Sequence, residues 1–449
     1  MLFLNGYSTL VDNWGIGPDN GTYRAKDGRY VTMCTLHPRL RDGFLDYFQC
    51  ANSTAAIQKA VEKKTGQQLE DETAALNLTL GMVRAPQEWL AHPQGEATAK
   101  RAMIEIERKG NARKRVLGKA KHRPLEGVRA IEFTQVVAGP QCTMVLADQG
   151  ADVIKVQPPL GNVVYPIWIS LSWGKKNILL DIKSSYGKQR FTELLAGADV
   201  IVDSNRPGAL TKLGFDEDTL REINPNLVYA KMSLCPPGTP WANRKGFEQV
   251  AQAVSGVVHR HSEDLPEPQL VAALINDALT AYLLATGVVA ALAEREEKGG
   301  YWDTGAYLSR CSTMALDFVE PLDAEEYAPV NMQDLIEHGV DQVAPWGTFT
   351  RFAPPVAFSH IPSFAARPTS WPGMDPDTIG WTENPAGDGP PKVPHYPSKL
   401  AREGGIRNLL PTYGIQDRGD GQGGLGLASK DIPEPDRSLI MQYFQAHRR

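Results

Sequence analysis

Between residues 124 and 233, short and nearly continuous apolar runs alternate with segments in which apolar residues recur every three or four positions. The first pattern is typical of strands buried on both faces, and the second of amphipathic helices. Such alternation indicates an α/β domain with a doubly wound parallel sheet, which binds ligands at the carboxyl ends of its strands. The predicted strands are 128–134, 152–157, 176–182, 199–203 and 227–233, and the predicted helices are 140–149, 186–195 and 216–223.

The pattern before residue 100 is mixed. A hairpin is predicted at 22–35, with Asp27-Gly28 as its turn, and helical spacing follows at 39–48, 54–64 and 70–80. Much later, 277–297 shows the longest helical pattern of the chain. The expected organisation is a small α+β domain at 1–99, a linker at 100–123, the α/β domain at 124–320, and a partial return segment with a Pro/Gly-rich tail at 321–449.

The segment 100–123 holds ten Lys or Arg against two Glu. We interpret it as a solvated linker between domains. Contact with nucleic acid is the weaker alternative, because no aromatic residue is interleaved for base stacking. The net charge of the whole chain also argues against a nucleic-acid-binding protein, because a charge of −5 shows no basic surplus.

Composition narrows the class of protein further. Hydrophobic residues make up 42% and charged residues 22%, as in soluble globular proteins. The longest uncharged apolar run is shorter than the ~20 residues that span a bilayer, and the N-terminus does not resemble a signal peptide. We therefore expect a cytoplasmic protein without membrane contact. Five widely spaced cysteines without a Cys-x-x-Cys pair indicate free thiols and no metal site.

Two loops at predicted strand ends could bind an anion. In the first, Gly139-Pro140 opens a helix whose free N–H groups suit a diphosphate. A tight turn without a ligand is an equally good interpretation, because the Gly-x-Gly-x-x-Gly fingerprint of dinucleotide sites is absent. In the second loop, Arg206 beside Pro207-Gly208 could hold phosphate through its guanidinium. Lys183, Lys212 and Lys245 could add charge, although each lysine taken singly fits a surface residue better.

Asp277 opens the long helical pattern at 277–297. A carboxylate at a helix N-terminus is stabilised as the anion by about 0.3–1 kcal/mol. It could be an ordinary N-cap, which is the better interpretation from these residues alone. It could also be a nucleophile, which must be ionised, exposed and fixed.

An ordered series of short motifs resembles the class III CoA-transferases, the family of carnitine, formyl-CoA and bile-acid CoA-transferases and of α-methylacyl-CoA racemases. The resemblance covers about 190 residues and is specific because the motifs keep their order. The motifs include Pro124–Arg129, Ala138-Gly139-Pro140, Leu146–Val156, Leu180–Lys183, Arg206-Pro207-Gly208, Ile223-Asn224-Pro225, Gly246-Phe247, Ala251–Gly256 and Asp277.

The resemblance implies a Rossmann-like CoA-binding domain, a smaller second domain and an interlocked homodimer. It implies an acyl-CoA donor and a carboxylic acid acceptor as substrates, with CoA as substrate and no tightly bound cofactor. Asp277 falls on the family's catalytic aspartate, and Val137 and Phe247 fall in its substrate pocket. The residues that fall on CoA contacts are Val136, Ala138, Gly139, Leu180, Lys183, Asn205, Arg206, Lys212 and Lys245.

The resemblance also implies a reaction. In the transferases, the aspartate forms a mixed anhydride with the donor acyl group and then an aspartyl-CoA thioester, which the acceptor acid resolves. In the racemases, a histidine shares proton transfer with the aspartate, and Phe247 stands at that position here. Because Phe247 cannot carry a proton, racemisation is the second alternative, and an inactive CoA-binding protein is the third.

This sequence departs from the family pattern at several positions. Val137 replaces a glutamine of formyl-CoA transferases, Gln157 replaces a usual acidic residue, and Ser204 interrupts the run before Arg206. No glycine-rich lid is evident. The hairpin at 22–35 resembles the later half of the family's chain, so the order of the parts is unusual.

Overall fold

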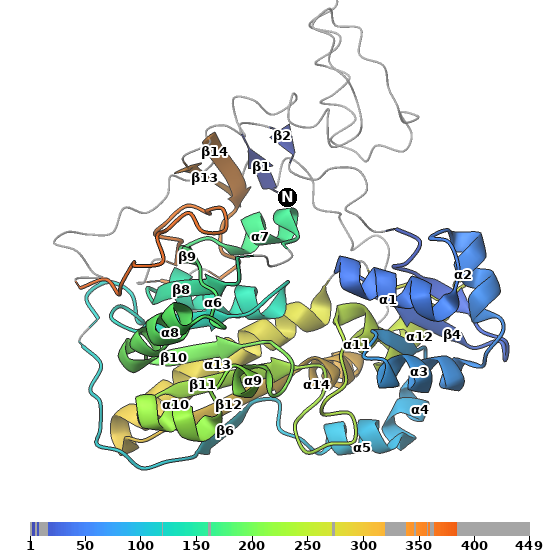
Figure 1. Ribbon diagram of the computed structural model, residues 1–449, viewed down its shortest axis with the longest axis horizontal. Coiled ribbons are helices and arrows are strands. Elements are labelled where there is room, and N and C mark those ends of the chain that lie inside the picture. The colour runs from blue at the N-terminus through green and yellow to red at the C-terminus, as the bar shows by residue number, and fades with distance from the viewer. Residues whose placement is uncertain are drawn as a thin grey trace, which may run out of the picture.

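The computed structural model describes residues 2–4, 7–8, 17–118, 120–159, 163–271, 274–318, 338–344, 347–356, 358–359 and 363–383. Within them, the strands form three sheets (Figure 1). The largest is a mostly parallel seven-stranded sheet with helices on both faces, so the predicted α/β class is confirmed. Residues 384–449, the last part of the expected Pro/Gly-rich tail, lie outside the described residues.

The seven-stranded sheet has the order β6-β12-β11-β10-β7-β8-β9. Every neighbouring pair is parallel except β6 with β12. Numbered from β7, the parallel strands follow the order 3-2-1-4-5-6 of doubly wound nucleotide-binding sheets. The strands are β6 (Glu105–Arg108), β7 (Arg129–Phe133), β8 (Asp152–Gln157), β9 (Lys175–Leu179), β10 (Val200–Asp203), β11 (Val228–Ser233) and β12 (Trp302–Tyr307).

The five predicted strands match β7 to β11 within a few residues. Sequence patterns missed the two strands at one edge of the sheet, β12 and β6. The second of these belongs to the basic segment 100–123, which we expected to be a linker. Its residues Glu105–Arg108 pair antiparallel with Trp302–Gly305, and only Glu105 is partly buried. An exposed edge strand carries little apolar signal, which explains why it was missed.

Helices cover both faces of this sheet, and two separate apolar clusters mark the two layers (Figure 1). The helices α6 (Ala138–Asp148) and α13 (Ile275–Lys298) pack on one face, and α8 (Ser185–Gly197) and α10 (Glu217–Ile223) on the other. The long helix α13 is the one helix in the described ranges with the length and apolar character to cross a membrane. Leu284, Val288 and Leu292 of this helix are buried in the apolar cluster shared with the sheet, as in the core helix of a globular domain.

The chain reverses its winding direction between β7 and β10, which are neighbours in the sheet. At such a switch point the loops after two adjacent strands part and leave a crevice. Here the loops are 134–137 after β7 and 204–208 after β10. The short helix α9 (Ala209–Lys212) follows the second loop, and α7 (Tyr165–Leu171), which the sequence did not predict, lies beyond the end of β8.

The small sheet β3-β4-β5 is antiparallel, and its first two strands form the predicted hairpin. The helix predicted at 70–80 is wrong at its end, because α3 stops at Ala75 and Leu80 begins a strand that is buried at every position. The elements of this unit are β3 (Thr22–Arg24), β4 (Tyr30–Met33), β5 (Leu80–Met82), α1 (Pro38–Phe48), α2 (Thr54–Val61), α3 (Gly66–Ala75), α4 (Pro86–Ala91) and α5 (Pro93–Ala99).

A buried ionic network joins the small unit to the segment that precedes α11 (Glu248–Ser255). Glu70 of α3 receives hydrogen bonds from the guanidinium of Arg84, and Arg244 lies 3.4 Å from the same carboxylate. Arg244 also donates to the carbonyl of Leu80 at 2.9 Å. Because breaking a buried ion pair is costly, these contacts fix the small unit beside the crevice.

The remaining elements complete the described chain. A third, antiparallel sheet has the order β13-β14-β1-β2, so the first residues pair with a late segment. Its strands are β1 (Leu2–Leu4), β2 (Tyr7–Ser8), β13 (Gly339–Ala344) and β14 (Gly347–Phe352), and the other helices are α12 (Val257–His261), α14 (Leu308–Ala315) and the 3-10 turn η1 (Leu316–Phe318).

Candidate active site

Asp277 lies in the first turn of α13 and lines a pocket of about 160 Å³ at the crevice. The N-cap of this helix is Leu274, so the interpretation of Asp277 as a plain N-cap is wrong. The expectation of an exposed carboxylate is also wrong. The residue is only 8% exposed, and burial, with a further contribution from the charge of Glu248, raises its pKa well above the usual value.

Glu248, in the first turn of α11, supplies the cap that the helix α13 lacks. Its carboxylate accepts the backbone N–H of Asp277 at 2.6 Å and that of Asn276 at 3.2 Å. It also accepts the side-chain amides of Asn276 and Gln252 at 2.9 and 2.8 Å. Burial raises the pKa of Glu248, while these donors favour its anion. Of the two carboxyl groups, Glu248 therefore has the surroundings that favour the anion more.

The loop after β7 and the start of α6 form another part of the pocket wall. Val136, Val137, Ala138, Gly139 and Phe247, all expected at the site, line the same pocket as Asp277. Val136 has φ 66°, a strained conformation for a β-branched residue. A Cβ on Gly139 would lie 2.5 Å from the Cβ of Thr134, so only glycine allows the helix to start this close to the strand.

A second pocket, of about 390 Å³, adjoins the first and is basic. Arg206 follows β10, Lys245 precedes α11, and Arg39 comes from α1 of the small unit. Burial lowers the pKa of Lys245 to about 8, and the charges of Arg206 and Arg39 contribute to the shift. Three cationic side chains gathered at one pocket form a favourable site for a phosphate or diphosphate.

A third pocket, of about 220 Å³, lies on the other side of the β10 loop. It is lined by Leu180, Lys183 and Asn205, three of the residues that the resemblance places at CoA. The side-chain amide of Asn205 donates to the carbonyl of Phe133 at 2.7 Å and so ties the two crevice loops together. Lys212 is different, because it is exposed at the end of α9 and is not among the residues that line these three pockets.

Sequence reasoning missed three residues of the site. Glu248 could have been noticed as an acidic residue that opens an otherwise uncharged helical run. Arg39 and His37 gave no signal, because nothing in a single sequence brings the small unit to the crevice. His37 lines the basic pocket, and its ring centre lies 6.1 Å from that of Phe247. Burial and, to a lesser extent, Lys245 lower the pKa of His37, and its buried Nδ1 has no partner among the described residues.

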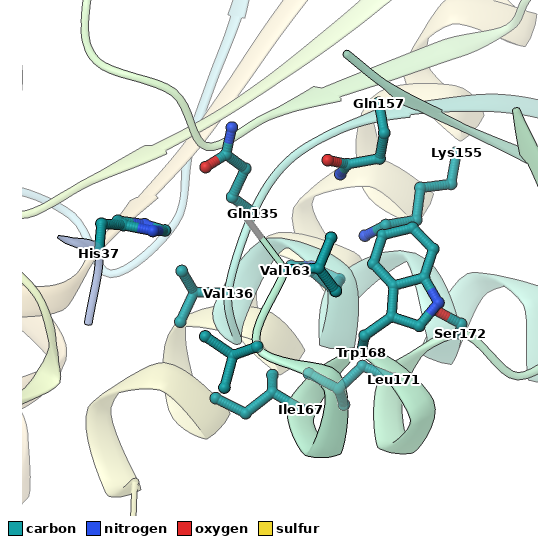
Figure 2. A pocket seen from close by; sticks show the side chains of 12 residues that line it. His37, Gln135, Val136, Lys155, Gln157, Val163, Ile167, Trp168, Leu171 and Ser172 are labelled. Carbon is teal, nitrogen blue, oxygen red and sulfur yellow. The ribbon is translucent and has the colours of Figure 1, made fainter. Parts of the chain in front are cut away.

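A small pocket of about 30 Å³ continues the cavity toward α7 (Figure 2). Figure 2 shows His37 at one end, Lys155 and Gln157 at the other, and Gln135 and Val136 between them. Gln135 and Val136 also line the pocket of Asp277. The candidate site is therefore a chain of connected pockets along the carboxyl edge of the sheet.

These features define a class of protein: a doubly wound α/β protein with an anion-binding crevice and a buried carboxyl group beside it. The family model of CoA-transferase family III matches residues 125–350, about half of the chain, and the chain belongs to this family.

The curated relatives carry several transferase names. The chain is 35% identical over 190 residues to the probable fatty acyl-CoA transferase Rv3272 of Mycobacterium tuberculosis, which covers 39% of this chain and 48% of that protein. It is 35% identical over 209 residues to the succinyl-CoA:mesaconate CoA-transferase of Haloarcula hispanica, covering 42% and 53%. It is 36% identical over 186 residues to the formyl-CoA:oxalate CoA-transferase of Streptomyces avermitilis, covering 39% and 45%. The chain thus spans about half the length of the curated relatives it matches.

One solved structure among the matches is that of Rv3272 from Mycobacterium tuberculosis. It matches with a TM-score of 0.41 and 33% identity, over 44% of this chain and 57% of that one.

Proposed function

We propose that this chain transfers coenzyme A between carboxylic acids and that Asp277 is the nucleophile. The observation that carries the proposal is the position of Asp277, a carboxyl group in the wall of a cavity that opens onto a basic pocket. Glu248 holds its backbone in place. A fixed carboxyl group in the wall of a cavity is arranged for covalent catalysis, because little reorganisation is needed when the substrate arrives.

The proposed placement of CoA follows the pockets. The phosphate groups lie against Arg206, Lys245 and Arg39, since guanidinium and ammonium groups bind phosphate. The nucleotide base lies near Leu180 and Lys183. The thiol end passes the helix start at residues 138–139 and brings the thioester to Asp277. In this placement Lys212 acts only through its distant charge.

The proposed reaction has four bond exchanges. First, the Asp277 carboxylate attacks the thioester carbonyl, the C–S bond breaks, and CoA thiolate leaves a mixed anhydride. The thiolate then attacks the aspartyl carbonyl and releases the donor acid, which leaves an aspartyl-CoA thioester. Next, the acceptor carboxylate attacks this thioester, the C–S bond breaks, and CoA thiolate leaves a second anhydride. Finally, the thiolate attacks the acyl carbonyl, which gives the new acyl-CoA and frees Asp277.

The raised pKa of Asp277 has two opposite effects on this reaction. Fewer molecules carry the nucleophilic anion at a given pH, but a more basic carboxylate is a stronger nucleophile once it has formed. Rates should therefore rise with pH until Asp277 is fully ionised.

The test is exchange between a panel of acyl-CoA donors and free acids, followed by mass spectrometry of the protein. We expect CoA exchange together with an acyl or CoA adduct on Asp277, and loss of both in Asp277→Asn. The control variant is Asp264→Asn, which changes an exposed aspartate of a loop. Unaltered exchange in Asp277→Asn would contradict the proposed role.

A second candidate function is proton exchange at the α-carbon of an acyl-CoA. The observation that favours it is His37, an imidazole with a lowered pKa close to Phe247. A neutral imidazole can accept a proton, so His37 could replace the base that Phe247 cannot provide. Deuterium that enters the α-carbon from D₂O without CoA exchange, and that His37→Gln abolishes, would favour this candidate over transfer.

We further propose that the chain forms a homodimer, as the resemblance implies, and has the domain limits predicted from the sequence. We propose a cytoplasmic location from the sequence, whose start does not resemble a signal peptide. Native mass spectrometry of the purified chain tests the dimer, and a single peak at the monomer mass would contradict it.

A further inference from the structure

Three charged side chains meet beneath the small pocket next to α7. The carboxylate of Glu132 on β7 accepts hydrogen bonds from the ammonium groups of Lys155 on β8 and Lys175 on β9, the second at 2.7 Å. Thr134 and Thr143 donate their hydroxyls to the same carboxylate at 2.8 and 2.5 Å. Glu132 and Lys175 are fully buried, and Lys155 is 2% exposed. The cluster therefore contains two cations and one anion with almost no access to solvent.

An excess buried cation is unfavourable unless another anion compensates it. This unfavourable effect acts on Lys175. Burial lowers the pKa of its ammonium group to about 8, and the charge of Lys155 contributes to the shift. Asp148 does not supply the missing charge, because it interacts with Arg351 and with Arg123 as well as with Lys175.

Lys155 is the member of the cluster that reaches the pocket. Its ammonium lies 4.6 Å from the centre of the Trp168 ring. Its one oxygen partner within the described part of the chain is Glu132, although an ammonium can donate three hydrogen bonds. Gln157, two residues along β8, points to the same face and carries no charge (Figure 2). The hydroxyl of Ser172, in the pocket wall, is buried and has no partner among the described residues.

The size and position of this pocket restrict its occupant. About 30 Å³ is room for roughly two water molecules, and so for the two oxygens of one carboxylate. Gln135, Val136, Val164 and Ile167 line both this pocket and that of Asp277. A molecule that reacts at Asp277 can therefore place its far end here only if it is short.

We propose that this pocket binds the second carboxylate of a short dicarboxylic acid whose first carboxylate reacts at Asp277. The proposal rests on the proposed function and names its substrate class. The bound carboxylate provides the negative charge that the cluster lacks, accepts a hydrogen bond from Lys155, and takes another from the hydroxyl of Ser172. A monocarboxylic acid of the same length would place a methyl group beside a buried ammonium.

The test compares acids of equal length as acceptors, succinate with butyrate and glutarate with pentanoate. We expect kcat/KM to be about tenfold or more higher for each dicarboxylate, as for a charge-assisted hydrogen bond. Gln157→Glu introduces the missing negative charge and should bring the ratio close to one. Gln189→Glu makes the same change on the exposed surface of α8 and should keep the ratio. Lys155→Met should also abolish the preference, provided that its melting curve shows a folded protein.

Calorimetric titration of succinate and butyrate into the CoA-bound protein gives a measurement without turnover. Succinate binding that Gln157→Glu abolishes supports the pocket even if no CoA exchange occurs, in which case the proposed function alone fails. Equal kcat/KM for succinate and butyrate, or equal affinities where there is no turnover, would overturn the carboxylate pocket. A dicarboxylate preference that survives in Gln157→Glu would overturn it as well.

Discussion

The carboxylate of Glu248 accepts the backbone N–H of Asp277 at 2.6 Å, so one acidic residue fixes the position of the other. The same contact places a negative charge beside a buried carboxyl group and raises the pKa of Asp277, whose burial has the larger effect. Position and ionisation of the proposed nucleophile are thus coupled through one hydrogen bond.

The first prediction concerns the pH dependence of Glu248→Gln. A neutral amide removes the charge that disfavours ionisation of Asp277, so the pKa of Asp277 falls. Because the nucleophile acts as the anion, the rising limb of the single-turnover rate should move to lower pH. A pH profile of adduct formation measures this shift. If the rising limb of the pH profile stays at the same pH while the maximal rate falls, Glu248 affects only the position of Asp277 and not its pKa.

A second prediction separates the structural role of the same residue. Glu248→Ala leaves buried amide donors without an acceptor, and we expect unfolding free energy to fall by about 2–4 kcal/mol. Urea denaturation measures the loss. Gln58→Ala, at a surface position of α2 with hydrogen bonds of its own, should cost much less, and an equal cost in both variants would contradict the proposed capping.

The basic pocket predicts a pH-dependent affinity for CoA. Lys245 is charged below its pKa of about 8, so KM for the acyl-CoA should rise as pH increases through that value. Bound phosphate would move the transition upward, because it stabilises the charged form. Lys245→Arg should flatten the profile, since arginine keeps its charge. A profile that remains the same in Lys245→Arg would exclude Lys245 as its origin.

Lys245 and Lys212 both fall on CoA contacts by resemblance, but their removal should have different effects on KM for the acyl-CoA. Lys245→Ala should raise KM for the acyl-CoA by about ten- to hundredfold, as for the loss of a hydrogen bond to a charged group. Lys212→Ala should change it little, because Lys212 is exposed outside the three pockets. Steady-state kinetics at low and moderate salt measures both, and equal effects would contradict the proposed placement of the phosphates.

The buried cluster around Glu132 predicts an effect on stability. Two lysines lower the pKa of Glu132 to about 2 against the opposing effect of burial, whereas the unfolded chain has the ordinary value of 4.5. The depressed pKa therefore contributes stability above about pH 4.5, and this contribution is lost as the pH falls toward 2. Glu132→Gln should cost about 3–5 kcal/mol at neutral pH, since it leaves two buried cations unpaired.

Urea denaturation at pH 7 and pH 3 measures this effect, and the difference between the variant and the unaltered protein should shrink at the lower pH. Glu222→Gln, at an exposed position of α10, is the matched control and should stay within about 0.5 kcal/mol. A difference that is the same at both pH values would contradict the linkage.

Much of the α/β domain could be predicted from the sequence because its signals are local. Buried parallel strands are apolar throughout and amphipathic helices repeat every three or four residues, so the strands β7 to β11 were evident without any tertiary information. The glycine at 139 and the cluster of expected residues around it also followed from motifs in consecutive positions. The sequence missed β6, whose residues are mostly exposed, and the end of α3, where a strand follows within a few residues.

The sequence by itself determined the α/β class, the family resemblance, and Asp277 as the residue of interest. Only the tertiary structure decided its state, because burial and the charge of Glu248 act through space on a group that looked exposed in the sequence. It also decided that Arg39 and His37, more than two hundred residues from Phe247 along the chain, lie in the same basic pocket. Charge imbalance in the core, such as that of Glu132 with Lys155 and Lys175, depends on which strands are neighbours in the sheet, and strand order follows from packing rather than from local spacing.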